Sequence, residues 1–281
     1  MKKKNGFTKK YVILNSFQDL ISGRPCDPEI NSGRRKRGFT LAEVLITLGI
    51  VGMVAEMTIP TLMKNVQNEQ YVISLKKSYT VVNSALKQIA SDNGCVDDLT
   101  CVTTLVNDSS VDAFGDEFAS YFNVVKNCGT TIDDGCFPAR TNQSIDGRGA
   151  GMLLDTSSGW YRFVTADGVS IGLFKSNPAI SWASPEGEKN VSPVYGTVLI
   201  DVNGRKKPNI YGRDTFNFYI TNGGGASLYP YGGKYDNKFG DGSWWNNGGQ
   251  NLCFMSNTMG AKNGSSYCTG RVMEEGWEMN Y

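Results

Sequence analysis

Histidine is missing from all 281 residues of this chain. Without an imidazole, the Ser–His and Cys–His pairs that activate most nucleophiles cannot be built. The sequence also lacks a Walker phosphate loop and a dinucleotide-binding fingerprint. Adjacent acids do occur, but neighbouring carboxylates are usually solvated loop charges: Asp97/Asp98, Asp133/Asp134 and Glu274/Glu275. We therefore expect a protein that is not an enzyme and that uses no nucleotide.

One long stretch has neither lysine nor arginine. It covers residues 39–63 and directly follows four cations at residues 34–37. As a helix, 25 residues extend about 37 Å, which exceeds the hydrocarbon core of a bilayer, about 30 Å thick. Flanking cations mark the cytoplasmic side of a span. The sequence thus predicts a single-pass anchor in the membrane, with the chain after it exported.

Two acids interrupt the apolar stretch. Glu43 stands four residues from its start, where a carboxylate facing lipid is costly unless it reaches headgroup water or meets a positive partner. We favour the positive partner. Glu56 lies 17 residues beyond Phe39, about 26 Å along a helix, where interfacial water can solvate it. The role of Glu56 stays open.

The string Gly-Phe-Thr-Leu-Ala-Glu-Val-Leu-Ile at residues 38–46, with cations before it and about twenty apolar residues after it, resembles the class III signal of type IV pilins and type II secretion pseudopilins. In that family, a membrane prepilin peptidase cuts after the glycine on the cytoplasmic side and methylates the new N-terminus. The resemblance implies a cut between Gly38 and Phe39 and methylation of Phe39. It also implies that Glu43 pairs with the N-terminal ammonium of a neighbouring subunit. Such a pair selects register, because a shifted neighbour leaves both charges unpaired.

Two other export signals compete for the same region. Arg34 and Arg35 could belong to a twin-arginine signal, but no small-residue cleavage site follows the apolar run. Cys26 could belong to a lipoprotein signal, but charge and proline precede it. We therefore favour the class III signal.

Cleavage would remove a basic leader, residues 1–38. This leader holds 10 of the 28 cations and 3 of the 27 acids, which leaves 18 cations and 24 acids, a net charge of −6, in the mature chain. A basic nucleic-acid footprint is therefore missing from the exported part. We expect no nucleic-acid partner, except DNA as a ligand of a filament tip.

The cysteine count supports the same cut. Seven cysteines become six when Cys26 is discarded, and an even number suits three disulfides in an exported domain. Fifteen pairings are open, among which the three between sequence neighbours close short loops: Cys95–Cys101, Cys128–Cys136 and Cys253–Cys268. A zinc site is the weaker alternative, because the spacings differ from those of structural zinc and no histidine is present.

The helix should continue past the membrane. Pro60 lacks an amide donor, so we expect a kink there. Residues 64–93 then place apolar side chains three and four apart on one face, as in an amphipathic helix: Val72, Leu75, Tyr79, Val82, Leu86 and Ile89. Asn93 and Gly94 supply the stop. A helix from Phe39 to about Asp92 would be roughly 80 Å long; sustained heptads of a coiled coil are missing.

The exported domain, residues 94–281, reads as β-rich. Residues 95–150 alternate apolar patches with polar breaks and suggest a connecting region closed by disulfides. Strands are predicted at residues 152–155, 160–165, 169–174, 195–202 and 216–220. We predict an α+β fold: a long N-terminal helix, with a membrane half and an amphipathic half, packed on a small antiparallel sheet of four or five strands with disulfide-stapled loops.

Two segments of this domain are candidate ligand-binding sites. Asp201, Asn203 and Asp214 could supply oxygens to a structural calcium ion, as in some secretion pseudopilins, although the spacing does not fit an EF-hand. The alternative, which we favour, is two Asx-stabilised turns. Residues 221–251 are rich in Gly, Asn and aromatics, including Trp244 and Trp245, and suit either a surface loop packed on its own sheet or a sugar- or protein-binding loop.

Three functions can be compared on these observations. The first is a pilin-like structural subunit of a type IV pilus or type II secretion pseudopilus, with the prepilin peptidase, other subunits and an inner-membrane assembly platform as partners. The second is a minor, tip-located adhesin or ligand-binding subunit. The third is a membrane-tethered carbohydrate-active enzyme that uses one carboxylate. We favour the first, anchored in a bacterial inner membrane with its domain periplasmic or extracellular, and expect no cofactor beyond the calcium considered above.

Overall fold

The computed structural model describes residues 38–107, 110–131, 135–138, 145, 159–180, 193–222, 225–233, 253 and 267–281. The chain divides into two compact units, Met1–Val54 and Ala55–Tyr281. Several predicted features lie outside the described residues: the leader before Gly38 with Cys26 and Arg34–Arg35, the strand at 152–155, Asp133/Asp134, and the Trp244–Trp245 pair.

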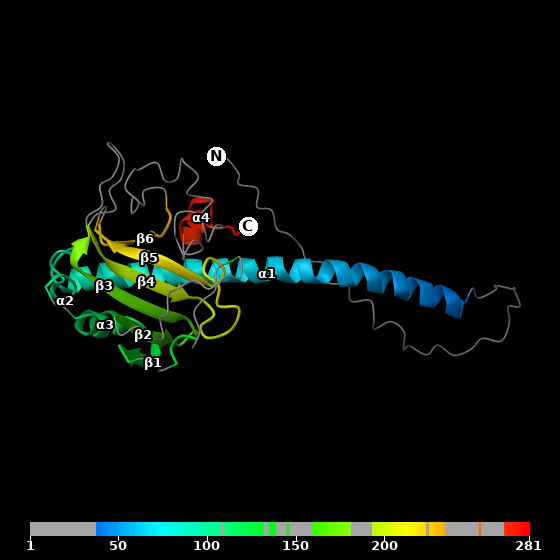
Figure 1. Ribbon diagram of the computed structural model, residues 1–281, viewed down its shortest axis with the longest axis horizontal. Helices are drawn as coiled ribbons and strands as arrows, with labels where there is room; N and C mark the ends of the chain where they lie inside the picture. The colour runs from blue at the N-terminus through cyan, green and yellow to red at the C-terminus, as the bar shows by residue number, and fades with distance from the viewer. Residues whose placement is uncertain are drawn as a thin grey trace, which may run out of the picture. The chain divides into compact units, whose positions relative to one another are not determined.

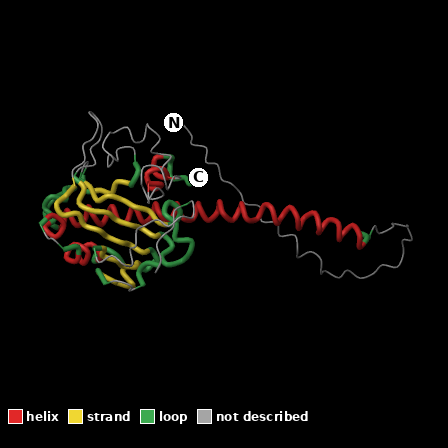
Figure 2. Tube along the Cα trace, in the orientation of Figure 1, coloured by secondary structure: helices red, strands yellow, loops and turns green. Residues whose placement is uncertain are grey.

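A single helix, α1, runs through Leu41–Asp92 (Figures 1 and 2). Within the described part of the chain, it is the helix that is long and apolar enough to cross a membrane, and its most apolar 18-residue window buries nothing. Phe39 just before it is 88% exposed and Leu45 is 60% exposed. The helix continues through Pro60, and the kink expected there stays a prediction. The long helix itself is confirmed.

The second unit is built around a six-stranded antiparallel sheet in the order β1-β2-β3-β4-β5-β6. Its strands are β1 Val124–Gly129, β2 Trp160–Thr165, β3 Ser170–Ile180, β4 Val194–Asp201, β5 Thr215–Thr221 and β6 Ser227–Pro230. Three short helices accompany them: α2 Thr103–Val106, α3 Asp112–Ala119 and α4 Cys268–Glu274. The predicted α+β class is confirmed, with two edge strands, β1 and β6, where the sequence suggested loops.

The second half of α1 packs on one face of this sheet (Figure 1). The predicted helix face is buried at five positions, Val72, Leu75, Val82, Leu86 and Ile89, and partly buried at Tyr79. Alternate residues of the strands complete the core, such as Ile171, Leu173, Val198, Ile200, Phe216 and Phe218. Every second side chain of a strand lies on the same face of the sheet. Strands β4 and β5 are buried at every residue, so their opposite face is covered as well. The amphipathic helix is therefore confirmed.

An aromatic contact, a hydrogen bond and an ion pair also join the helix to the sheet and its turns. The Tyr79 ring lies 5.6 Å from the Phe218 ring, between centroids. Asn83 Oδ1 accepts a hydrogen bond of 2.9 Å from the backbone amide of Leu228 in edge strand β6. Lys77 Nζ pairs with Asp167 in the turn between β2 and β3, at 2.9 Å. The helix is thus held at defined points along the sheet.

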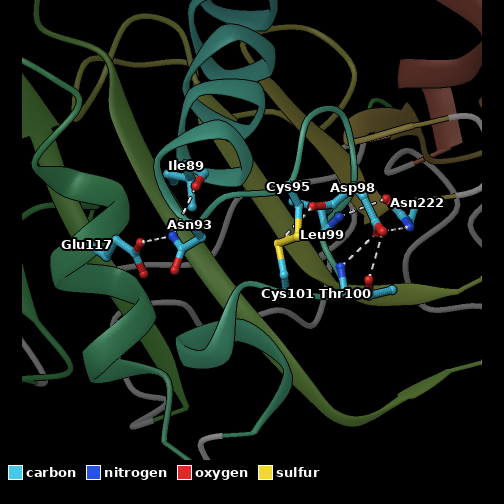
Figure 3. Close-up of a disulfide and its surroundings, with 9 residues drawn as sticks. All are labelled: Ile89, Asn93, Cys95, Asp98, Leu99, Thr100, Cys101, Glu117 and Asn222. Carbon is cyan, nitrogen blue, oxygen red and sulfur yellow. Dashed lines mark hydrogen bonds between the residues drawn. A yellow bond between two sulfur atoms is a disulfide. The ribbon is translucent and has the colours of Figure 1, made fainter.

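The end of α1 is tied to the sheet by the first disulfide loop (Figure 3). Gly94 adopts a φ of +85°, which suits a helix stop, and Asn93 Nδ2 donates to both Ile89 O and Glu117 Oε1.

Cysteines pair with their sequence neighbours: Cys95–Cys101, Cys128–Cys136 and Cys253–Cys268, with Cα–Cα distances of 6.2, 6.3 and 4.5 Å. The loops around the sheet are therefore closed covalently.

Truncation of Leu86 on the buried face of α1 should destabilise the domain more than truncation of a residue on the exposed face. We expect Leu86→Ala to lower the free energy of unfolding by about 2–5 kcal/mol, since Leu86 is fully buried and a cavity results. Val81→Ala is the matched control on the same helix, 43% exposed, and should cost less than about 1 kcal/mol. Urea unfolding of the full-length chain in detergent measures both, and equal losses would contradict this packing.

Candidate functional site

The N-terminus of α1 carries a reciprocal cap between Thr40 and Glu43. The Thr40 amide and hydroxyl both donate to Glu43 Oε2, at 2.9 and 3.0 Å, and the Glu43 amide donates back to Thr40 Oγ1 at 3.2 Å. This is the capping box of a Thr-x-x-Glu sequence, which satisfies amides that otherwise lack intrahelical partners. The sequence contains the signal at Thr40-Leu41-Ala42-Glu43, but our sequence analysis missed it.

The cap uses only one of the two carboxylate oxygens of Glu43. Both hydrogen bonds reach Oε2, and Oε1 makes none with the described residues. An ionised carboxylate can accept several hydrogen bonds over its two oxygens. A cation from another molecule can therefore meet Oε1 while Thr40 still holds Oε2. The two residues that flank the expected cut, Gly38 and Phe39, are both exposed.

The apolar residues that follow are uncovered. Large side chains between Leu41 and Met63 are exposed by 41–78%, including Val44, Leu48, Val51, Met57 and Leu62. Surface of this kind is unfavourable in water and favourable in lipid or against other apolar helices. The first half of α1 therefore needs an apolar environment that the described part of the chain does not provide.

The segment between β4 and β5 holds the three residues considered for calcium. Asp214 accepts from the amides of Asn209 and Ile210, at 2.8 and 2.6 Å, and from Asn203 Nδ2 at 3.1 Å. Asp201 Oδ1 accepts from the Asn203 amide at 3.3 Å. The structure thus brings Asp201, Asn203 and Asp214 together, and most of their contacts are side chain to backbone, as in Asx-stabilised turns.

Several oxygens in this segment remain without partners. Asp201 Oδ2, Asn203 Oδ1 and Asn209 Oδ1 are buried and accept no hydrogen bond. Burial raises the pKa of Asp201 well above its usual range, and the nearby Asp214 raises this pKa further. Burial also raises the pKa of Asp214, although the amides of Ile210 and Asn209 act in the opposite direction. Uncompensated buried acceptors are uncommon in folded proteins.

Carboxylates are few in this segment. Among the described residues, no group of three or more His, Cys, Asp or Glu side chains could hold a metal ion. The segment supplies only two carboxylates, so a bound ion would depend on amide oxygens and water as further ligands. Calcium accepts all three kinds of oxygen. Asn209 was not among the residues singled out in the sequence, because its side-chain position depends on the folded loop.

The adjacent acids have structural partners. Asp98 accepts hydrogen bonds from the amide and hydroxyl of Thr100 and from Asn222 Nδ2, at 2.9, 2.8 and 2.7 Å (Figure 3). The bonds from Thr100 lower the pKa of Asp98. Asp97 pairs with Lys87 at 3.2 Å, and Glu275 pairs with Arg271 at 2.9 Å. These contacts anchor loops and the end of a helix.

One known family model matches the start of α1. Residues 33–55 match the family model described as the prokaryotic N-terminal methylation motif. Searches of curated proteins and of solved structures each give no match. The capped start of the exposed apolar helix lies inside this match. The chain therefore carries an N-terminal methylation motif, which agrees with the resemblance of residues 38–46 to the class III signal of type IV pilin-like precursors.

Loss of the cap should be detectable in the isolated chain. We expect Thr40→Val to weaken the first turn of α1 by about 1 kcal/mol, because the Thr40 hydroxyl no longer bonds Glu43. Amide exchange in micelles should then rise roughly fivefold at Glu43. Thr47→Val is the matched control, since the Thr47 hydroxyl bonds only the Val44 carbonyl within the helix. Similar exchange in both variants would contradict the cap.

Proposed function

We propose that the chain is the precursor of a structural filament subunit. A prepilin peptidase cuts it between Gly38 and Phe39, Phe39 is N-methylated, and an inner-membrane assembly platform polymerises the mature subunit with other pilin subunits into a type IV pilus or a type II secretion pseudopilus. The observation that carries this proposal is an uncovered apolar helix half that begins inside a methylation motif. The domain after it lies in the periplasm before assembly.

The uncovered half suits two apolar environments in turn. In the membrane, lipid covers the side chains of residues 41–63. In a filament, the same side chains pack against neighbouring helices, so extraction does not return this surface to water. Each Å² kept from water contributes about 25 cal/mol, and over twenty residues this term is large. The second half of α1 keeps its partner, the sheet, in both environments.

Glu43 selects how neighbours pack. Cleavage creates an ammonium on Phe39, and Glu43 Oε1 is the oxygen that its own helix cap leaves open. An ammonium from a neighbouring subunit that meets Oε1 offsets the burial of both charges. A neighbour shifted along the axis leaves two unpaired charges in an apolar bundle, so the correct register is favoured.

The N-terminus is the first test. Mass spectrometry of the chain from its native envelope should find methyl-phenylalanine at Phe39, and Gly38→Ala should leave only the uncut precursor. Glu43→Gln should still be cut but should yield few or no sheared filaments, since the ammonium loses its partner. Glu56→Gln is the matched control on the same helix, and we expect it to assemble.

The outcomes separate the parts of this proposal. A native chain that retains its first 38 residues would exclude processing at Gly38. Filaments formed normally by Glu43→Gln would exclude the charge pair while leaving the cut intact. Loss of filaments in Glu56→Gln as well would show that assembly depends on acidic residues along the helix rather than on Glu43.

We also propose that the segment between β4 and β5 holds a structural calcium ion. Support comes from the three buried, unpaired oxygens of Asp201, Asn203 and Asn209 next to the Asp214 carboxylate. Asp201 and the two amide oxygens would bind the ion, and its charge would offset the burial of two acids. The competing explanation is that Asp201 holds a proton in place of a cation, as its raised pKa allows.

Thermal unfolding of the full-length chain in micelles distinguishes the two. At 100 times its Kd, calcium should stabilise the domain by about 2.7 kcal/mol, while magnesium at the same concentration should do little. Asp201→Asn should lose the calcium response. If calcium has no effect, a protonated Asp201 explains the site. Stability then falls as the pH rises from the ordinary value of 3.8 through the raised folded-state pKa, and Asp201→Asn flattens this dependence.

A further inference from the structure

A basic segment stands out in a part of the chain that has more acids than cations. Residues 39–281 hold 18 cations and 24 acids, yet residues 203–213 hold four cations and no acid: Arg205, Lys206, Lys207 and Arg213. Arg205, Lys206 and Lys207 are exposed, and Arg213 is half-buried. None of the four forms an ion pair with a residue that the structure describes. Their positive charge is therefore unused within this part of the fold.

This segment lies beside the helix where the apolar stretch ends. A pocket of about 120 Å³ is lined by Lys64 and Asn68 of α1, by Ile210 and Arg213 of the segment, and by Met279 and Tyr281. Asn203 Nδ2 also reaches Tyr71 OH of α1 at 3.5 Å. Lys64 is the first cation after residues 39–63. When the apolar stretch spans a bilayer, Lys64 and this pocket lie at its exported surface.

The pocket has polar groups without partners. Arg213 Nε and Asn68 Oδ1 are buried and make no hydrogen bond. An anionic oxygen in the pocket would accept from the Arg213 guanidinium and meet Lys64, while the Asn68 amide can turn its NH₂ toward the same oxygen. Guanidinium groups suit phosphate because their donors form a planar fork.

Cations also converge at the other side of the segment. A Cβ added to Gly135 would lie 3.2 Å from Arg205 Nη1 and 3.2 Å from Lys126 Nζ. Arg205 thus stands near a second cation outside the segment. The neighbouring groove along α1 differs, since its lining includes Glu69 and Glu278 as well as Lys76. Cations without acids are therefore gathered at the 203–213 segment and Lys64.

We propose that Lys64, Arg213 and the exposed Arg205–Lys207 run bind the phosphates of anionic phospholipid headgroups on the exported face of the membrane. We call these five cations the headgroup patch. The proposal rests on the membrane-anchored state of the proposed function. The patch holds the domain against the bilayer before assembly, and these contacts break when the subunit leaves the membrane. Surface attraction of this kind grows with each cation and falls with salt.

Lipid selectivity of the full-length chain tests the patch. Native mass spectrometry in a neutral detergent can compare phosphatidylglycerol with phosphatidylcholine at one ionic strength. Both lipids cover the apolar helix, so their affinity ratio reports the headgroup. The wild-type chain should prefer phosphatidylglycerol, and this preference should fall about fivefold for each cation removed in Lys64→Gln/Arg213→Gln or in Arg205→Gln/Lys206→Gln/Lys207→Gln.

Lys77→Gln/Lys87→Gln is the matched control. It removes two cations from the same helix, at positions where each pairs with an aspartate outside the patch, and should keep the preference. An equal affinity for both lipids in the wild type would overturn the proposal, as would an equal loss in the control, because net charge would then explain binding. Thermal unfolding of each variant checks that it folds.

Inorganic phosphate separates the two sources of the anion. If millimolar phosphate displaces phosphatidylglycerol at constant ionic strength, the pocket is a free phosphate site and the lipid proposal is wrong. If it does not, the lipid proposal stands. None of these measurements needs cleavage or polymerisation. If the chain is cut after Gly38 but does not prefer phosphatidylglycerol, only the headgroup patch is rejected. If the chain prefers phosphatidylglycerol but is never cut, only the proposed processing is rejected.

Discussion

Burial of one face of α1 against the sheet is the interaction on which the domain depends. Leu75, Leu86 and Ile89 are fully buried in the core that α1 shares with the strands, and the Tyr79 ring lies 5.6 Å from the Phe218 ring, between centroids. The same helix leaves its apolar residues before Met63 exposed. One element thus has two surfaces with different requirements, an apolar surface that stays with its own domain and an apolar surface that needs lipid or other subunits.

Charged side chains along and around α1 differ in whether they have partners within the described fold. Glu43 is bound by its own helix cap through one oxygen and keeps the other open to a partner. Farther along, the first cation after the apolar stretch joins Arg213 at a pocket beside the sheet. Acids with local partners, such as Asp98 and Glu275, hold loops and helix ends. The described ionic groups therefore include some that complete the fold and others that leave a charged atom without a partner among the described residues.

Much of the fold follows from local pattern. The spacing of Val72, Leu75, Val82 and Leu86 predicts a buried helix face because residues three and four apart share a face in any α-helix. Strands β2, β3, β4 and β5 are recognisable by alternation and β-branched residues. The edge strands β1 and β6 were read as loops, since their four to six residues are stabilised by one neighbouring strand each and carry little pattern of their own.

The sequence by itself determined the methylation motif, the apolar stretch, the extent of the helix and the even number of cysteines after Gly38, because each follows from the order of residues along the chain. Tertiary structure decided the partners of those residues. Three examples join residues 13 to 149 positions apart: Asp201 lies near Asp214, Lys64 and Arg213 line one pocket, and Asn83 bonds Leu228. Such contacts depend on how the sheet and helix pack, which no local pattern encodes.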